Sequence, residues 1–256
     1  FPKGISKNKK LKELLLSSNQ ITLEADRIPV HPSLEKLELQ KNKINTLPAS
    51  IRNFPNLKRL MLSYNAIEHV DPAIASLTKL EQLSFYKNKL KAIPEGVYAL
   101  QNLKEIDLYY NEIERLDDQI SHLKNLGVLY LSNNSIFSIP ESLYSLTQLE
   151  ELYLSNNRLT ELPQGIGSMD RLKVLRINNN RLIRIPKDLP RLINLENLDI
   201  SSNQLTELPD GLLKLQSLKL LVLINNPWDM SSLNKMPAFA QYFRNKEVVI
   251  HIEDNP

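Results

Sequence analysis

Residues 152–163, LYLSNNRLTELP, combine an alternating apolar stretch with a pair of asparagines. Leu152 and Leu154 alternate with polar neighbours, which is the period of an extended strand with one buried face. Asn157 follows three residues after Leu154, and asparagine recurs along the chain at a constant spacing of 23 residues. The ten positions are Asn19, Asn42, Asn65, Asn88, Asn111, Asn134, Asn157, Asn180, Asn203 and Asn226. A constant period of this length indicates a solenoid of stacked repeats.

Apolar residues keep the same period. Leucine stands eight residues before each of these asparagines, and apolar residues recur five and three residues before them. The pattern L-x-x-L-x-L-x-x-N-x-L, continued as L-P-x-x-I-x-x-L, resembles the leucine-rich repeat. Its 23-residue form is similar to the Ras-group-like repeats of plant and animal intracellular proteins and of bacterial proteins. The resemblance covers about residues 1–230 and implies protein–protein interaction.

The repeat predicts an α/β solenoid. We expect a curved horseshoe with a parallel β-sheet on its concave face and mostly irregular or 3-10 limbs on its convex face. Strands stack about 4.8 Å apart, while the return limbs need more room, so the stack must curve. Prolines in the return limbs fix φ and donate no hydrogen bond, which excludes long helices there. These are Pro48, Pro94, Pro140, Pro163, Pro186 and Pro209.

The recurring asparagine has a predicted structural role. Backbone groups at the corner where each strand ends cannot all pair with the neighbouring strand, and buried backbone groups need partners. An amide side chain offers both an acceptor and two donors. A stacked column of asparagines is therefore expected to satisfy the corner of its own repeat and that of a neighbour.

Three segments are expected. Residues 1–10 match the end of a preceding repeat, because Phe1-Pro2-Lys3-Gly4-Ile5 follows L-P-x-x-I in register, so the chain opens inside a repeat. Residues 11–230 hold ten repeats. Residues 231–256 are expected to form a C-terminal cap with a short helix over 237–244 and a strand over 247–253, because a solenoid core needs terminal caps.

Composition argues against several kinds of site. The chain has 32 Lys and Arg and 29 Asp and Glu, a net charge of +3, which does not call for nucleic acid. No apolar run reaches membrane-span length, and the absence of cysteine excludes disulfides and thiolate metal sites. The four histidines do not converge, none is expected on the strand face, and His31 is expected to be a satisfied core residue. We therefore expect no catalytic site, metal or cofactor. The compartment stays open: cytoplasmic, or secreted or cell-surface if the source is bacterial.

Seven positions before the asparagines, charged residues alternate in sign from repeat to repeat, except at Gly127, where the alternation is interrupted and its phase resets. Opposite charges on neighbouring strands stabilise correct register modestly. We interpret this column as a structural ladder rather than a docking surface. The lysine-rich stretch SKNKKLK, residues 6–12, is interpreted as solvated surface, with an arm that binds an anion or nucleic acid as the alternative.

Tyrosines gather at outward positions of the predicted sheet or its adjoining turn. Tyrosine offers a large rigid contact area with a polar tip and is enriched at binding hot spots. The residues expected to contact a partner are Tyr64, Tyr86, Lys87, Asp107, Tyr109, Tyr110, Tyr130, Tyr153 and Arg176. The alternative is that repeat drift left scattered tyrosines on an exposed sheet.

Outward positions near the C-terminus are apolar: Val174, Leu220, Val222 and Ile224. Either the terminal cap covers them or they form a contact with a second copy or another partner. We expect a monomer, with a dimer through the C-terminal end as the alternative.

The predicted function is a non-enzymatic module that binds a protein or peptide on its concave face. Two alternatives stay open. The chain could be the substrate-recognition part of a larger enzyme, such as a bacterial effector ligase, or it could bind a cell-surface glycan. The length of the full reading frame and a glycan array would distinguish them.

Overall fold

The structure is a computed structural model that describes residues 4–23, 28–208 and 211–252. Contacts divide the chain into two compact units. Unit 1 comprises the residues through Ile113 together with His122–Tyr130. Unit 2 comprises Glu114–Ser121 together with the residues from Leu131 onward. Each unit is described by itself below.

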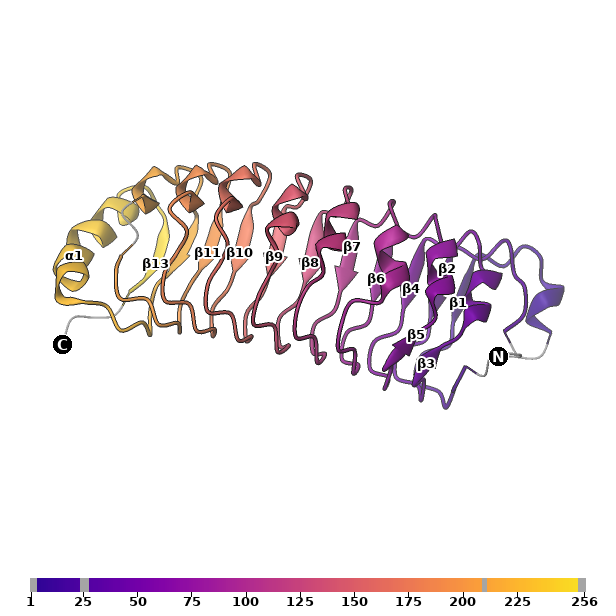
Figure 1. Ribbon diagram of the computed structural model, residues 1–256. Coiled ribbons are helices and arrows are strands. Elements are labelled where there is room, and N and C mark those ends of the chain that lie inside the picture. Colours follow the sequence, from indigo (N-terminus) through magenta and orange to yellow (C-terminus); the bar gives the residue numbers. More distant parts are fainter. Residues whose placement is uncertain (1–3, 24–27, 209–210, 253–256) are drawn as a thin grey trace. The chain divides into compact units, whose positions relative to one another are not determined.

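In unit 1, six short strands form a parallel array (Figure 1). They are β1 (Glu13–Leu15), β2 (Lys36–Glu38), β4 (Arg59–Met61), β6 (Gln82–Ser84), β7 (Glu105–Asp107) and β8 (Val128–Tyr130). Each residue pairs with the residue 23 positions later, as Leu37 does with Leu60. The spatial register therefore equals the sequence period, as expected for a stack of equal coils.

In unit 2, the parallel strands are β9 (Glu151–Tyr153), β10 (Val174–Arg176), β11 (Asn197–Asp199), β12 (Leu220–Val222) and β13 (Val249–His251). The first four keep the 23-residue register. The strand β13 pairs Ile250 with Leu221, an interval of 29 residues. It is thus supplied by the segment after the repeats and extends the sheet by one strand.

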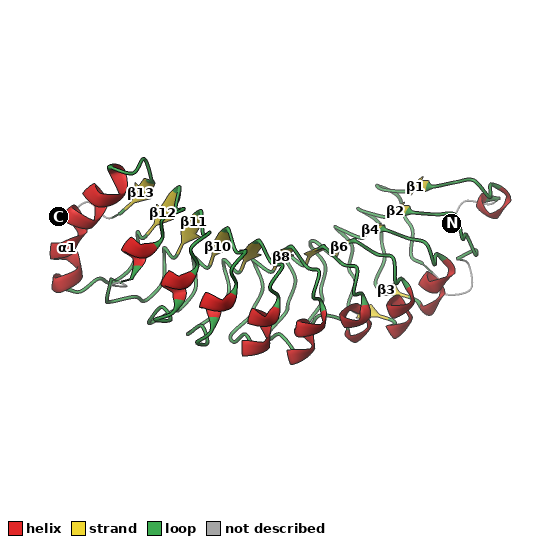
Figure 2. Ribbon diagram, turned by 90° about the horizontal axis from the view of Figure 1, so that it is seen from above, coloured by secondary structure: helices red, strands yellow, loops and turns green. Residues whose placement is uncertain are grey.

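Within each unit the strands lie on one face and short 3-10 helices on the opposite one (Figure 2). The helices are η1 (Ile5–Lys7), η3 (Ala49–Asn53), η4 (Pro72–Ser76), η5 (Glu95–Ala99), η6 (Asp118–His122), η7 (Glu141–Ser145), η8 (Ile166–Ser168), η9 (Leu189–Arg191) and η10 (Leu212–Lys214). The core between the faces consists of the periodic apolar residues, and Leu57, Leu60 and Leu62 are completely buried. The predicted solenoid, with a parallel sheet and 3-10 limbs, is confirmed.

Aspartate replaces the recurring proline in the third repeat and changes the return limb locally. Because Asp71 has a backbone N–H, this group donates to the Leu47 carbonyl at 2.9 Å, which a proline could not do. This hydrogen bond adjoins a second, two-stranded sheet of β3 (Thr46–Leu47) and β5 (His69–Val70). The Asp71 carboxylate also accepts from the Ala73 N–H and caps η4.

The asparagine column forms the predicted ladder. Asn157 Nδ2 donates to the carbonyls of Leu154 and Ser155 in its own repeat and of Leu131 in the preceding repeat. Its Oδ1 accepts from the Ile136 N–H. Each amide thus joins its own corner to the preceding one, and most members of the column are buried or half-buried.

A second polar ladder was not predicted. It occurs in six of the repeats, 14 residues after the asparagine, where the chain returns toward the next strand. Its side chains donate to carbonyls of the preceding repeat at 2.6–3.0 Å. The donors are Ser33, Asn56, Asn102, Asn125, Asn194 and Ser217. The same 23-residue period marks this column in the sequence.

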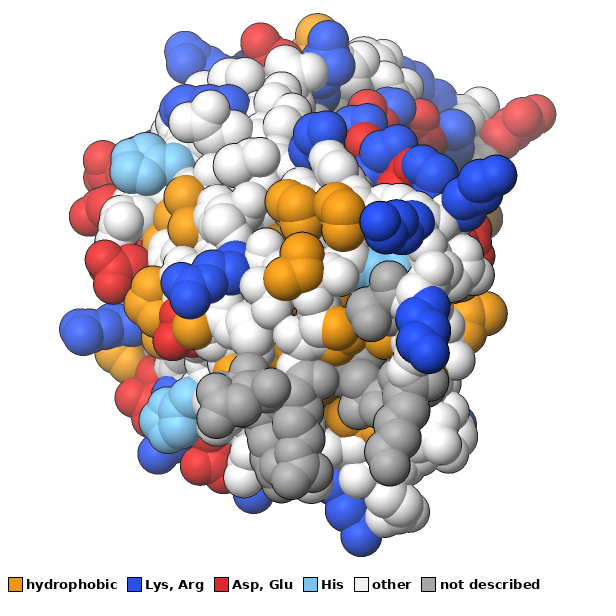
Figure 3. Space-filling model, turned by 90° about the vertical axis from the view of Figure 1, so that its right-hand side faces the viewer, with side chains coloured by type: hydrophobic (Ala, Val, Ile, Leu, Met, Phe, Trp, Pro, Cys, Tyr) orange, Lys and Arg blue, Asp and Glu red, His pale blue; other side chains and the backbone are white. Residues whose placement is uncertain are grey.

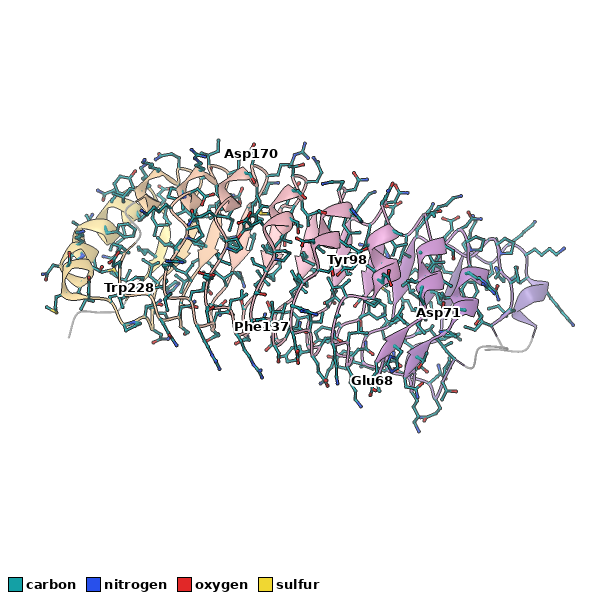
Figure 4. The ribbon with its side chains drawn as sticks, in the orientation of Figure 1. Glu68, Asp71, Tyr98, Phe137, Asp170 and Trp228 are labelled. Carbon is teal, nitrogen blue, oxygen red and sulfur yellow. The ribbon has the colours of Figure 1, made fainter. Side chains whose placement is uncertain are left out.

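The helix of the C-terminal region, α1 (Met230–Arg244), is longer than the predicted helix over 237–244. Asp229 starts it early, because its carboxylate accepts a hydrogen bond from the Ser232 N–H at 2.7 Å. Trp228, labelled in Figure 4, precedes the helix and is buried, and its indole N–H donates to the Leu223 carbonyl. The strand β13 falls within the predicted range, of which Glu253 lies outside the described residues.

Figure 3 views the N-terminal end of unit 1, where hydrophobic side chains are exposed among Lys and Arg side chains. Leu15 and Val30 are among the exposed apolar residues of this part of the chain. Lys9 and Lys10 are exposed as well, in line with a solvated surface. Residues 1–3 of the expected N-terminal remnant lie outside the described residues. Across the described ranges, no helix is both long enough and apolar enough to span a bilayer.

Candidate partner-binding site

The predicted contact residues fall into two groups, one in each unit. Tyr64, Tyr86, Tyr109 and Tyr110 lie in unit 1, with Lys87, Asp107 and, on β8, Tyr130. Tyr153 and Arg176 lie in unit 2 on β9 and β10. The two groups are therefore described separately.

The first four tyrosines of unit 1 touch one another and are called the tyrosine cluster. The Tyr86 ring is at its centre, with centroid distances of 5.0 Å to Tyr64, 5.9 Å to Tyr109 and 5.8 Å to Tyr110. The Tyr109 and Tyr110 rings are 5.0 Å apart. Tyr64 and Tyr110 are the outermost, with 41% and 45% of their surfaces exposed. The cluster is thus preassembled yet open to a partner.

Buried polar groups hold one side of the cluster in place. The Asp107 carboxylate accepts hydrogen bonds from the Ser84 hydroxyl and from the Tyr109 N–H. The Ser84 hydroxyl lies 2.8 Å from that of Ser63, which extends the network into the repeat before that of Ser84. Burial raises the pKa of the Asp107 carboxyl, while these hydrogen bonds oppose the rise. Asp107 therefore holds the backbone of Tyr109 in place, and Ser63 and Ser84 were not predicted.

The phenol of Tyr86 is held in its protonated form. A hydrogen bond with Tyr64 and, next, burial raise the pKa of Tyr86 to about 12. At neutral pH the hydroxyl is protonated, as it would be at the ordinary pKa of tyrosine, and it shares its hydrogen bond with Tyr64. The centre of the cluster is neutral, so the charges around it come from neighbouring side chains.

Two lysines flank the Tyr64 ring. The ammonium of Lys41 lies 5.7 Å from the ring centroid, and that of Lys87 lies 5.2 Å from it. Both distances are within cation–π range. Lys41 was missed in the sequence analysis, although it occupies the same column of the repeat as Lys87, two repeats earlier.

This column has an unusual backbone. The residue directly before each ladder asparagine has a φ between 52° and 59°, in the left-handed region. The column consists of Ser18, Lys41, Tyr64, Lys87, Tyr110, Asn133, Asn156, Asn179, Ser202 and Asn225. Asparagine tolerates this conformation better than other side chains, and large side chains there are strained. Unit 2 uses asparagine at four of its five positions, whereas unit 1 carries lysine or tyrosine at four of its five.

The group in unit 2 is smaller. The Arg176 guanidinium lies 5.9 Å from the Tyr153 ring centroid, and the Tyr153 hydroxyl donates to the Glu151 carboxylate at 2.6 Å. Glu151 was not among the predicted residues, but it lies two positions from Tyr153 on the same strand and side of the sheet.

Two hollows lie in unit 1. One of about 270 Å³ lies in the strand face beside the cluster and is lined by Glu38, Arg59, Gln82, Glu105 and Asp107, among others. The other, of about 670 Å³, lies between the return limbs of two repeats and contains no member of the tyrosine cluster. Glu68, labelled in Figure 4, lines this second hollow.

The apolar residues near the C-terminus remain half-buried on the strand face of unit 2. Helix α1 packs against β13 and η10. A dimer through this end stays a prediction.

Histidines and carboxylates form no reactive constellation in the described part of the chain, where no cluster of three or more metal-ligand side chains occurs. His31 is a satisfied core histidine, 1% exposed, with its ring nitrogens beside the Asn8 carbonyl and the Ser33 hydroxyl. His251 contradicts the expectation that no histidine lies on the strand face. It pairs with Val222 because the strand that carries it comes from the segment after the repeats.

Comparison with known families gives matches along most of the chain. A leucine rich repeat model matches residues 9–67, 32–90, 55–113, 78–136 and 101–159, and a second leucine-rich repeat model matches residues 144–246. No curated protein matches the chain.

Three solved structures illustrate the similarity. A leucine-rich repeat protein of Leptospira interrogans is 27% identical over 98% of this chain and 74% of that chain, with a TM-score of 0.68. The Arabidopsis receptor kinase HAESA, in complex with the peptide hormone IDA and the co-receptor SERK1, is 31% identical over 88% of this chain and 40% of that chain, with a TM-score of 0.78. The functional domain of InlJ from Listeria monocytogenes is 24% identical over 97% of this chain and 49% of that chain, with a TM-score of 0.76, and shows the fold alone. The chain thus spans less than half the length of the latter two.

Proposed function

The chain belongs to the leucine-rich repeat family, and we propose that it binds a protein or peptide partner through the tyrosine cluster on the strand face of unit 1. Its fold is one that protein-interaction modules use. The proposal assigns no chemical step to this chain. In this function the tyrosine cluster recognises the partner and takes no part in catalysis.

The left-handed column is the observation that carries the proposal. Tyr64 and Tyr110 occupy positions where asparagine would suit the backbone better, and unit 2 has asparagine at four of the five equivalent positions. A left-handed conformation costs a large side chain roughly 1–2 kcal/mol. Strain of this kind is concentrated at functional sites, where another role compensates for it.

The physical basis of binding is preorganisation. Tyr86 contacts the other three rings, and Asp107 anchors the backbone of Tyr109, so few rotamers are lost when a partner docks. Each immobilised flexible side chain would otherwise cost about 0.5–1.5 kcal/mol on binding. The exposed rings of Tyr64 and Tyr110 then supply apolar area with a polar tip.

One solved structure supports a peptide or protein as the partner class. HAESA, which is similar to this chain in fold and in 31% of aligned residues, is seen with a peptide hormone and a co-receptor. Since the chain spans 40% of that protein, the likeness concerns this region and not the activity of the whole receptor kinase.

Selection of random-sequence peptides against the intact chain tests the proposal. The selected peptides should bind Tyr64→Ala and Tyr110→Ala variants at least about tenfold more weakly, as expected for hot-spot residues. Phe137→Ala is the matched control, because Phe137 is an aromatic residue of unit 2 with 51% of its surface exposed. Equal binding to all three variants would refute the cluster as the site.

A further inference from the structure

Lysine and tyrosine alternate along one edge of the strand face in unit 1. Lys41, Tyr64, Lys87 and Tyr110 occupy the left-handed column in four consecutive repeats, and we call them the lysine–tyrosine ridge. All four are exposed. Since this backbone position suits asparagine, both residue types are held there at a conformational cost. We therefore expect a partner that contacts both the lysine ammonium groups and the tyrosine rings.

The spacing of the ridge restricts the conformation of that partner. Neighbouring strands lie about 4.8 Å apart, so residues two repeats apart are separated by about 9.6 Å along the stack. This separation applies to the pair Tyr64 and Tyr110 and to the pair Lys41 and Lys87. A polyproline II helix has three residues per turn and rises about 3.1 Å per residue, or about 9.3 Å per turn. Side chains one turn apart on such a helix therefore have nearly the same spacing as the two tyrosines, or the two lysines, of the ridge.

Other regular conformations match less well. Side chains on one face of an extended strand recur after about 6.6 Å, since the rise is about 3.3 Å per residue. An α-helix presents successive turns at about 5.4 Å. A segment of either kind that lies along the ridge would meet the tyrosines and lysines out of step.

The charges of the ridge restrict the composition of the partner. Neither Lys41 nor Lys87 forms an ion pair with any described residue, whereas Lys58 and Lys89 do. Their ammonium groups lie instead within 6 Å of the Tyr64 centroid. A partner carboxylate could approach these ammonium groups without displacing an internal anion.

We propose that the lysine–tyrosine ridge binds an acidic, proline-rich peptide segment in the polyproline II conformation, with a carboxylate at every third residue. The proposal rests on the proposed function and names its ligand class. Prolines pack on the rings of Tyr64 and Tyr110, as such segments do in aromatic-lined grooves. The carboxylates meet Lys41 and Lys87. Because this conformation is already populated in the free peptide, little ordering is required on binding.

A set of synthetic peptides tests the ligand class. The probe is a fluorescent peptide of four Pro-Pro-Glu triplets, and binding to the intact chain is followed by fluorescence anisotropy. Two peptides of the same length are controls: Pro-Pro-Lys triplets reverse the charge, and Pro-Pro-Pro-Glu quadruplets shift the carboxylate to every fourth residue. We expect binding of the first peptide only. Comparable binding of either control would overturn the proposal.

Variants of the chain locate the contact. Lys87→Asn and Tyr64→Asn should each weaken binding of the Pro-Pro-Glu peptide about tenfold, with no loss in Tm. Lys91→Asn removes an exposed lysine outside the ridge and should leave the affinity unchanged. An affinity that is equal in Lys87→Asn and in the parent would overturn the role of the ridge.

The random-peptide selection separates failure of this inference from failure of the proposed function. Selected peptides that require Tyr64 and Tyr110 but lack proline and acidic residues would support the site and overturn the ligand class. If neither the selected peptides nor the Pro-Pro-Glu peptide depends on the tyrosines, both proposals are wrong.

Discussion

Asn157 and Ile136 lie in successive repeats and are joined by a hydrogen bond of 2.9 Å, in which the Ile136 N–H donates to Asn157 Oδ1. The same amide donates to the carbonyls of Leu131 and Leu154 at 3.0 Å. One side chain thus satisfies backbone groups of two repeats.

Replacement of Asn157 by alanine should therefore lower the free energy of unfolding by about 1–3 kcal/mol, because it leaves buried backbone groups without partners. Urea denaturation followed by circular dichroism measures the change. The control is Asn156→Ser at the adjacent exposed position, where serine already occurs in other repeats, with a cost below about 0.5 kcal/mol. Denaturation curves of Asn157→Ala that coincide with those of the parent would contradict the ladder.

The left-handed column predicts opposite effects in the two units. Lys87→Asn relieves a strain of about 1–2 kcal/mol and loses a cation–π contact worth about 0.5–1 kcal/mol. The variant should be as stable as the parent or up to about 1.5 kcal/mol more stable. Asn156→Lys introduces the strain in unit 2 and should destabilise by about 1 kcal/mol. Thermal unfolding of both variants gives the sign of each change in stability. Two changes of the same sign would contradict the strain assigned to the left-handed column.

Acid should weaken the charged ladder in unit 1. Hydrogen bonds from Lys12 and Lys58 lower the pKa of the Glu35 carboxyl from 4.5 to about 2. Because the pKa of Glu35 is lower in the folded state, its ion pairs with Lys12 and Lys58 stabilise the fold above pH 4.5. This stabilisation is lost as the pH falls toward 2.

When the pH is lowered from 4.5 to 2, the Tm of the Glu35→Gln variant should therefore fall less than the Tm of the parent. Because 30% of the Glu35 side-chain surface is exposed and its lysine partners are more exposed still, the difference should be small and should shrink at high salt. Thermal scans across this pH range at low and high salt measure it. If the Tm of the parent and that of the variant fall equally at low salt, the ion pairs of Glu35 with Lys12 and Lys58 contribute nothing to stability.

Gly96 should tolerate no side chain. A methyl group there would lie 2.7 Å from the Pro72 carbonyl oxygen and 2.8 Å from Ile74 Cγ2, because η5 packs closely on η4. Gly96→Ala should cost about 1–3 kcal/mol through overpacking. At Gly127 the nearest atom, the Lys104 carbonyl oxygen, would be 3.5 Å away, so Gly127→Ala should change stability by no more than about 0.5 kcal/mol. Chemical denaturation of both variants measures the two changes in the free energy of unfolding. Equal losses for Gly96→Ala and Gly127→Ala would contradict the prediction.

Periodicity made most of the fold predictable. Residues that recur every 23 positions must occupy equivalent places in a stack, so the sheet, the core and the Asn157 ladder could be read before any coordinates. The ladder at Asn56 and Asn102 shares the period but was missed, because its residue type varies between repeats. The early start of α1 was missed because Asp229 acts as a cap only in its folded context.

The candidate site was predictable only in outline. Alternation placed Tyr64, Tyr86 and Tyr109 outward, but which rings touch depends on side-chain rotamers and on the hydrogen bond from the Tyr109 N–H to Asp107. The assignment of these residues to a partner stays a prediction. Lys41 became relevant once its ammonium was found beside the Tyr64 ring.

The repeat, the strand register and the identity of the buried columns follow from the amino-acid sequence alone, because a regular stack turns chain position directly into spatial position. The left-handed backbone of the column before each asparagine and the packing of the tyrosine rings became known only from the folded structure. Those features arise from contacts between side chains of neighbouring repeats and from the tight turn that ends each strand. Neither is encoded in the spacing of the leucines.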